Sequence, residues 1–226
     1  MTRPNIHVGR ADIAPSDTRP YRYGIFLEPP AEIALPALRA MDVAERLFGF
    51  HAANAYAPHI TLVGSIVLDG TEGELRDTIS AELAKHASFP VHNGGLTASL
   101  GSLVGFDFHH RADGSANDRL VELYTGLAAA TAGLRGYEPS DRHADRRRAT
   151  EAPEKFRGHL TLIGHDAAER PEAARRARAV LESLVADTPV SWTADTVTLY
   201  RFWSADWTDR YWLTQEWVPL QSWRLG

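Results

Sequence analysis

The hexapeptide HITLVG at His59–Gly64 returns in the second half of the chain as HLTLIG at His159–Gly164. Both copies are rich in aliphatic and β-branched residues, which predicts that each lies in a strand. Side chains alternate between the two faces of a strand, so the histidine and threonine of each copy share one face. Each strand is therefore predicted to bury its aliphatic side and to present an imidazole beside a hydroxyl.

A single H-apolar-T-apolar motif is weak evidence, because such a short pattern also arises by chance. The alternative interpretation is two ordinary strands whose histidines are hydrogen-bonded within the fold. Two copies in matching contexts favour a functional pair instead. If the two halves of the chain form related lobes, both motifs can line one cleft.

Two histidines and two hydroxyls suit phosphoester chemistry that needs no metal. An imidazole has an unperturbed pKa of about 6.5, so one ring can be neutral while the other is protonated. The neutral ring can take a proton from an attacking water or hydroxyl, and the protonated ring can donate to the leaving oxygen. Threonine hydroxyls can hydrogen-bond the non-bridging phosphate oxygens and stabilise the growing charge.

With these motifs the chain resembles the 2H phosphoesterase superfamily, which is named for its paired H-x-T-x motifs. It is most similar to the bacterial RNA 2′,3′-cyclic phosphodiesterase (2′-5′ RNA ligase-like) and cyclic phosphodiesterase branches. The segment RYGIFL at Arg22–Leu27 stands where the family has its opening strand. Val197–Ser204 followed by Arg210–Leu213 resembles the family's last strand pair, which ends in a tyrosine-containing hairpin. The resemblance covers about residues 22–220.

The resemblance implies an α+β fold with two pseudo-symmetric lobes, each a small antiparallel sheet with outer helices, and an active-site cleft between them. It implies that His59 and His159 are the acid/base catalysts, that Thr61 and Thr161 bind the phosphate, and that no metal or cofactor takes part. The chain would then be a cyclic phosphodiesterase, a hydrolase that opens the 2′,3′-cyclic phosphate of an RNA terminus or a small nucleotide.

Two other functions stay open beside this one. The same acid/base pair could serve a pathway enzyme that acts on a non-nucleotide substrate. The fold could also serve as a nucleotide-binding module without turnover, but the presence of both histidines and both threonines argues against that function.

Four further residues are weaker candidates for substrate binding. Arg157 would share a face with His159 if the strand began there, and a guanidinium suits a phosphate or carboxylate. Tyr211 matches the family's hairpin tyrosine. Trp203 and Trp207 lie near a turn and could stack on a base. The alternatives are a surface arginine, a half-buried core tyrosine, and tryptophans that pack between the closing strands and a helix.

The composition excludes several other classes of site. The 226 residues include no cysteine, which excludes disulfides, a cysteine nucleophile and thiolate zinc sites. The only lysines, Lys85 and Lys155, follow Ala and Glu, so no G-K phosphate loop exists. The pair His109-His110 is not followed by glutamate, H-E-x-x-H is absent, and we expect no metal. The net charge of −5 indicates that the surface as a whole is not a polyanion binder.

Residues 1–20 are predicted to form a flexible tail, and residues 21–226 a single bilobal domain. The basic segment DRHADRRR at 141–148 is predicted to be a solvated loop, with a mobile lid or an anion-attracting patch as the alternative. With no signal sequence and no apolar run of 18 residues, we expect a cytoplasmic monomer that does not contact membranes. The predicted strands are 22–27, 57–67, 89–100, 103–110, 156–164, 189–203 and 210–219, and the predicted helices are 36–48, 71–87, 117–134 and 171–185.

Overall fold

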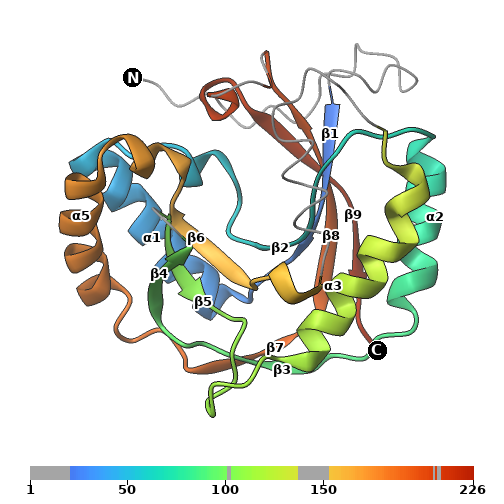
Figure 1. Cartoon of the computed structure of the whole chain (residues 1–226), viewed down its shortest axis with the longest axis horizontal. Helices are drawn as coiled ribbons and strands as arrows, with labels where there is room; N and C mark the ends of the chain where they lie inside the picture. Colours follow the sequence, from blue (N-terminus) through green and yellow to red (C-terminus); the bar gives the residue numbers. More distant parts are fainter. Residues whose placement is uncertain (1–20, 101–102, 137–152, 206, 208–209) are drawn as a thin grey trace.

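The computed structural model describes residues 21–100, 103–136, 153–205, 207 and 210–226. The predicted tail and the basic segment at 141–148 lie outside these residues. Within the described chain, no helix combines the length and the apolar character needed to cross a bilayer. Figure 1 shows two groups of helices, α1 with α5 and α2 with α3, on either side of the sheets.

The first lobe is a four-stranded antiparallel sheet in the order β2-β1-β8-β9. The helices α2 and α3 contact one another and lie on this lobe, α3 against β2 and α2 against β9 (Figure 1). The strands are β1 (Tyr21–Leu27), β2 (Ile60–Ile66), β8 (Thr196–Trp203) and β9 (Glu216–Arg224), and the helices are α2 (Glu72–Leu83) and α3 (Asp118–Thr131).

The second lobe is a three-stranded antiparallel sheet in the order β4-β5-β6, with α1 packed against α5 and β6. A two-stranded ladder of β3 and β7 joins the two halves of the chain. The strands are β3 (Phe89–His92), β4 (Leu96–Leu100), β5 (Leu103–Asp107), β6 (His159–Ile163) and β7 (Ser191–Ala194), and the helices are α1 (Ala31–Phe48) and α5 (Pro171–Leu184).

The two halves of the chain repeat one order of elements. The series β1-α1-β2-α2-β3-β4 matches β5-α3-β6-α5-β7-β8. In each half the first strand pairs antiparallel with the motif strand, and the last strand pairs with the first strand of the other half. This correspondence confirms the predicted pseudo-symmetric α+β fold, with β9 as an addition to the second half.

The helix between the first strand and the motif strand crosses to the other lobe in both halves. Helix α1 connects β1 to β2 but packs on α5 and β6, whereas α3 connects β5 to β6 but packs on α2 and β2. The motif strand β6 is therefore covered by α1, which connects two strands of the first lobe. The motif strand β2 is covered by α3, which connects two strands of the second lobe.

The motif strands bury their aliphatic side as predicted. Ile60, Leu62, Leu160 and Leu162 are at most 2% exposed and belong to the main hydrophobic core. Burial of such a side chain contributes about 1.5–3 kcal/mol, so this face fixes the register of both strands. The histidines and threonines of both motifs occupy the other face and are half-buried.

Two predicted strands are each broken into two. The strand predicted at 89–100 ends at His92 and resumes at Leu96. Between them the Asn93 side chain accepts a hydrogen bond from the Gly95 N–H at 3.0 Å, and Gly95 has φ of +80°, so the backbone turns. The strand predicted at 189–203 is likewise split between β7 and β8.

The strand predicted at 210–219 is wrong at its beginning. Tyr211–Leu213 forms a 3₁₀ turn, and the last strand runs from Glu216 to Arg224. The hydroxyl of Ser204 donates to the Tyr211 carbonyl at 3.0 Å and lies 2.9 Å from the Thr214 hydroxyl, which holds the connection as a turn. Tyr211 therefore lies between β8 and β9 and not within a strand.

The first helix begins earlier than predicted. It starts at Ala31 and contains Pro36 in its interior, where the prediction placed this proline in the first turn. The residues before the proline include Glu32 and Leu35, which are strong helix formers and extend the helix backwards. The remaining predicted elements differ from the structure only at their ends.

Candidate active site

The two motif histidines occupy equivalent positions where the lobes meet. His59 directly precedes β2 and His159 is the first residue of β6. Both strands lie at the edge of their sheets, and the two strands contact one another. The charge of a protonated His159 lowers the pKa of His59, so the two imidazoles lie within electrostatic range of each other.

Both imidazoles are held by the same hydrogen bond. The Nδ1 atom of His59 lies 2.7 Å from the carbonyl oxygen of Ala57, and that of His159 lies 2.7 Å from the carbonyl oxygen of Arg157. A carbonyl can only accept, so Nδ1 carries the proton in each ring. The Nε2 atom of each ring is therefore the atom that can accept or release a proton in a reaction.

His59 lies in an apolar environment. Its ring stacks on Phe26 with centroids 3.8 Å apart and an angle of 13°, and Tyr56 lies 5.5 Å away. Burial lowers the pKa of His59 to about 4, against the hydrogen bond that Nδ1 donates to the Ala57 carbonyl, which raises it. The neutral Nε2 accepts a hydrogen bond from the Thr61 hydroxyl at 3.1 Å. At neutral pH this ring is therefore uncharged, and its Nε2 atom can accept a proton.

His159 has a carboxylate beside it. Burial holds the pKa of His159 below its ordinary value, although the hydrogen bond to the Arg157 carbonyl and the charge of Asp107 act in the opposite direction. Asp107 is the direct partner of His159 in the β5–β6 ladder, and direct partners place their side chains on the same face. Burial would raise the pKa of Asp107, but hydrogen bonds from His110 and His109 outweigh it and hold that pKa below its usual value.

An aromatic cluster shares the face of the first sheet that carries His59. It forms a hydrophobic group separate from the main core and consists of Phe26, Tyr200, Phe202, Tyr56, Trp207 and Trp217. The Tyr200 hydroxyl donates to the Glu28 carboxylate at 2.6 Å, and burial and this bond raise the pKa of Tyr200 well above its ordinary value. The cluster therefore meets His59 through the rings of Phe26 and Tyr56.

The structure brings two of the four weaker candidates to this cluster. Trp207 is a member of it, with the Arg22 guanidinium 5.0 Å from its ring centre. Tyr211 lies 5.7 Å from Trp207, and its hydroxyl accepts a hydrogen bond from Tyr56 at 3.2 Å. Trp203 instead packs against the main core, because it alternates with Phe202 along β8.

Arg157 does not meet the condition under which it would share a face with His159. Strand β6 begins only at His159. The exposed Arg157 guanidinium folds back and donates to the backbone carbonyls of Glu154 at 2.8 Å and Phe156 at 2.7 Å. The backbone carbonyl of Arg157 is the group that contacts the histidine.

The pair His109-His110 is used within the fold. His109 is buried against Phe156, with ring centroids 5.8 Å apart, and His110 donates from Nδ1 to Asp107 at 2.8 Å. Over the described ranges, no three His, Asp or Glu side chains are grouped so that they could hold a metal ion.

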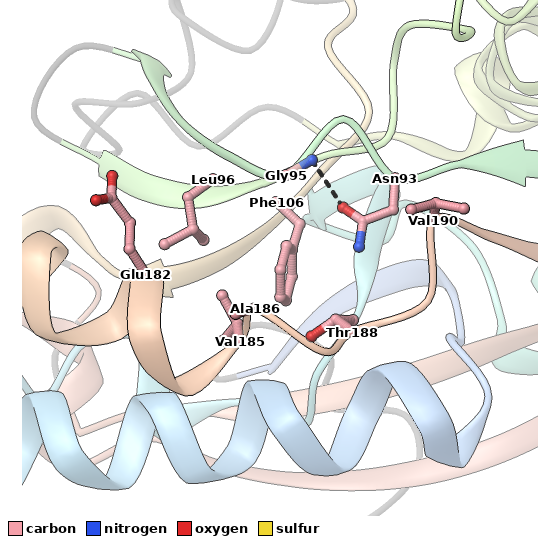
Figure 2. Close-up of a pocket in the computed structure, with 9 residues that line it drawn as sticks. All are labelled: Asn93, Gly95, Leu96, Phe106, Glu182, Val185, Ala186, Thr188 and Val190. Atoms are coloured by element: carbon pink, nitrogen blue, oxygen red, sulfur yellow. Dashed lines mark hydrogen bonds between the residues drawn. The ribbon is translucent and has the colours of Figure 1, made fainter.

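The second lobe has a pocket on the face of its sheet opposite to the face that carries His159 (Figure 2). Phe106, which lines it, alternates with Asp107 along β5 and so points away from the face of His159. Asn93, one of its polar lining residues, accepts a hydrogen bond from the Gly95 N–H, as the dashed line in Figure 2 shows. None of the predicted site residues lines this pocket.

The family model of the 2′-5′ RNA ligase superfamily matches residues 28–204, which include both motifs. This chain belongs to the 2′-5′ RNA ligase superfamily. Membership in this superfamily of phosphoesterases and ligases supports a phosphodiesterase-type activity and confirms the predicted 2H relationship. Among curated proteins, none matches the sequence.

Solved structures of related fold agree with the superfamily assignment. A phosphoesterase is 15% identical with a TM-score of 0.51, covering 91% of this chain and 99% of its own. Escherichia coli LigT complexed with phosphate is 18% identical with a TM-score of 0.51, covering 91% and 98%. The protein TT0787 of Thermus thermophilus is 16% identical with a TM-score of 0.54, covering 90% and 97%. At these identities the likeness concerns the fold alone.

Replacing Phe26 with alanine is expected to raise the pKa of His59 from about 4 toward 6.5. Burial disfavours the charged imidazolium, and removal of the stacked ring admits water to it. The measurement is an NMR titration of the histidine ring signals, with His59→Ala used to assign them. Phe202→Ala removes a ring from the same cluster that does not stack on His59, and should leave this pKa near its starting value. An unchanged pKa in the Phe26 variant would contradict the assignment of burial as the cause.

Three residues of this site were not predicted from the sequence: Phe26, Tyr56 and Asp107. Phe26 lies within the predicted opening strand, and its direct partner in the ladder is Thr61. Asp107 ends a predicted strand, and its partner is His159. Both positions could have been found only with the strand pairing and register in hand.

Proposed function

We propose that this superfamily member is a metal-independent phosphodiesterase that opens a cyclic phosphodiester, the 2′,3′-cyclic phosphate of an RNA end or of a small nucleotide. The observation that carries the proposal is the identical anchoring of two neighbouring imidazoles, each by Nδ1 to a backbone carbonyl. This anchoring leaves two Nε2 atoms for proton transfer, one for each end of an in-line displacement.

The reaction needs one histidine as base and the other as acid. The base takes a proton from water as the water oxygen bonds to phosphorus, and the acid protonates the ribose oxygen as its bond to phosphorus breaks. In the substrate complex the Thr61 hydroxyl turns its one proton from His59 Nε2 to a non-bridging oxygen, and the Thr161 hydroxyl donates to the other, so that both stabilise the charge that grows in the transition state. The anionic substrate favours protonation of the acid, because a nearby negative charge raises the pKa of an imidazole.

Two observations support a nucleotide as the substrate. Escherichia coli LigT has been solved with phosphate and with NADP⁺, and both structures share this fold. The aromatic cluster beside His59 offers ring faces on which a base could stack, with Trp207 as a partly buried member and Tyr211 in ring contact with Trp207. A non-nucleotide substrate of the same acid/base pair is the alternative, and turnover of any member of the panel below would favour the nucleotide enzyme over this alternative and over a binding module.

The test is a substrate panel measured with and without EDTA. The panel consists of 2′,3′-cyclic mononucleotides, ADP-ribose 1″,2″-cyclic phosphate, cyclic oligonucleotides and 2′-5′ linked RNA. We expect hydrolysis of a 2′,3′-cyclic phosphate that survives exhaustive chelation. Loss of turnover in EDTA that a divalent cation restores would contradict the metal-independent mechanism. Binding of the panel without turnover would support the nucleotide-binding module instead.

A further inference from the structure

The two lobes place an acidic residue at the same position beside each motif histidine. Leu27 pairs with Ile60 in the β1–β2 ladder, so the next residue, Glu28, follows toward His59. In the β5–β6 ladder the matching residue is Asp107, whose direct partner is His159. The pseudo-symmetry of the fold therefore provides a matched pair of carboxylates for comparison.

The two carboxylates are engaged differently. The Glu28 carboxylate accepts a hydrogen bond from the Tyr200 hydroxyl at 2.6 Å, within the aromatic cluster. The Asp107 carboxylate accepts from the His109 backbone N–H and from His110 Nδ1, each at 2.8 Å. The charge of Asp107 reaches His159, where it favours the imidazolium form.

The residues next to the two imidazole rings also differ. Phe26, which pairs with Thr61, stacks on His59 and disfavours a charge there. At the matching position beside Thr161 stands Gly105, which has no side chain to cover a neighbouring ring. Burial therefore disfavours the imidazolium form of both rings, and at His159 the charge of Asp107 acts against that effect.

The charged and titratable groups around His159 come from the start of β2, from β5, from the turn after β5 and from the segment before β6. His59 faces it from the start of β2, and Asp107 from β5. The turn after β5 supplies His110, which bonds Asp107, and His109. The Arg157 guanidinium folds back onto two carbonyls and lowers the pKa of His109. Among these groups, Asp107 is the carboxylate that acts on His159.

We propose that Asp107 is a positioning residue that makes His159 the proton donor and leaves His59 as the base. This assignment rests on the function proposed above. His59 Nε2 takes the proton from water while the water oxygen bonds to phosphorus. His159 Nε2 gives its proton to the ribose oxygen while the bond between that oxygen and phosphorus breaks. The second proton transfer restores what the first removed, so no other reactant is needed.

The test compares Asp107→Asn with Glu28→Gln as its symmetry-matched control. NMR titration of the histidine rings should show a lower pKa of His159 in Asp107→Asn, because the removed charge favoured the imidazolium. The alkaline limb of the kcat/KM profile, where the acid loses its proton, should move to lower pH. Above neutral pH we expect a roughly tenfold loss in kcat/KM. Glu28→Gln should leave that limb in place.

A third variant moves the same limb in the opposite direction. His110→Ala removes a half-exposed partner of Asp107 and leaves its charge free to act on His159, so the alkaline limb should move to higher pH. An equal effect of Asp107→Asn and Glu28→Gln on the pKa of His159 would overturn the proposal, as would a downward shift in His110→Ala. The NMR readout needs no substrate, so a protein that turns over nothing but shows the Asp107 effect would contradict the proposed function alone.

Discussion

Replacing either His59 or His159 with alanine should reduce kcat/KM on the true substrate by roughly 10²–10⁴, the usual contribution of general acid or base catalysis. The two proton transfers occur on opposite sides of phosphorus, so neither imidazole can replace the other. Each ring is held by its own backbone carbonyl, so its removal should leave the partner ring in place. The measurement is steady-state kinetics, with circular dichroism to check that each variant folds.

The double variant should lose less than the product of the two single losses, because the pair acts as a unit. Thr61→Ala and Thr161→Ala serve as comparison variants and should cost less, since a neutral hydroxyl is one of several phosphate contacts. The kcat/KM profile of the unmodified protein should be bell-shaped in pH. Near-full activity in either single histidine variant would rule out the two-histidine mechanism.

Replacing Gly105 with alanine should destabilise the second lobe and misplace its histidine. A Cβ atom there would clash with the carbonyl oxygen of Leu160, which is backbone of the motif strand and cannot rotate away. The β5–β6 ladder has a bulge at this glycine, so the strands must separate to admit a methyl group. We expect a loss of about 1–3 kcal/mol in the free energy of unfolding. A displacement of His159 by about 1 Å would cost roughly 10²-fold in kcat.

Gly133→Ala is the matched control, because a Cβ atom at Gly133 meets no other atom within 4 Å. Its free energy of unfolding should change by less than about 1 kcal/mol. Urea denaturation of both variants checks the stability, and kinetics at a temperature where both remain folded checks the activity. Equal stability of the two variants would show that the second sheet tolerates the added methyl group.

The sequence was most informative at the two motif strands, where the alternation of apolar and polar residues coincided with the repeat of the motif. The alternation in both motif strands correctly placed Ile60 and Leu162 in the core and the two histidines on the other face. The predicted lobes followed from the motif repeat and the family resemblance, and the superfamily match and the repeated topology confirm them.

The site was less predictable wherever it depends on strand register. Phe26 and Asp107 reach the histidines across ladders, and a sequence does not state which residue faces which across a pair of strands. Trp203 and Phe202 are adjacent in sequence, yet they belong to different hydrophobic groups because they point to opposite faces. The turn at Tyr211 depends on hydrogen bonds of Ser204, which no periodic pattern encodes.

The crossing of α1 and α3 between the lobes bears on the ancestry of the chain. In a single half, with the order β-α-β-α-β-β, the helix between the first strand and the motif strand would extend away from its own sheet. The motif strand of that half would then have no helix to cover it. Its first strand would also keep only the motif strand as a partner and lack the second partner, which the other half supplies. Two identical halves could complete each other only by exchanging these elements, as a domain-swapped dimer does. Duplication and end-to-end fusion of such a half would turn that exchange between molecules into the present single-chain architecture, with one histidine inherited from each copy.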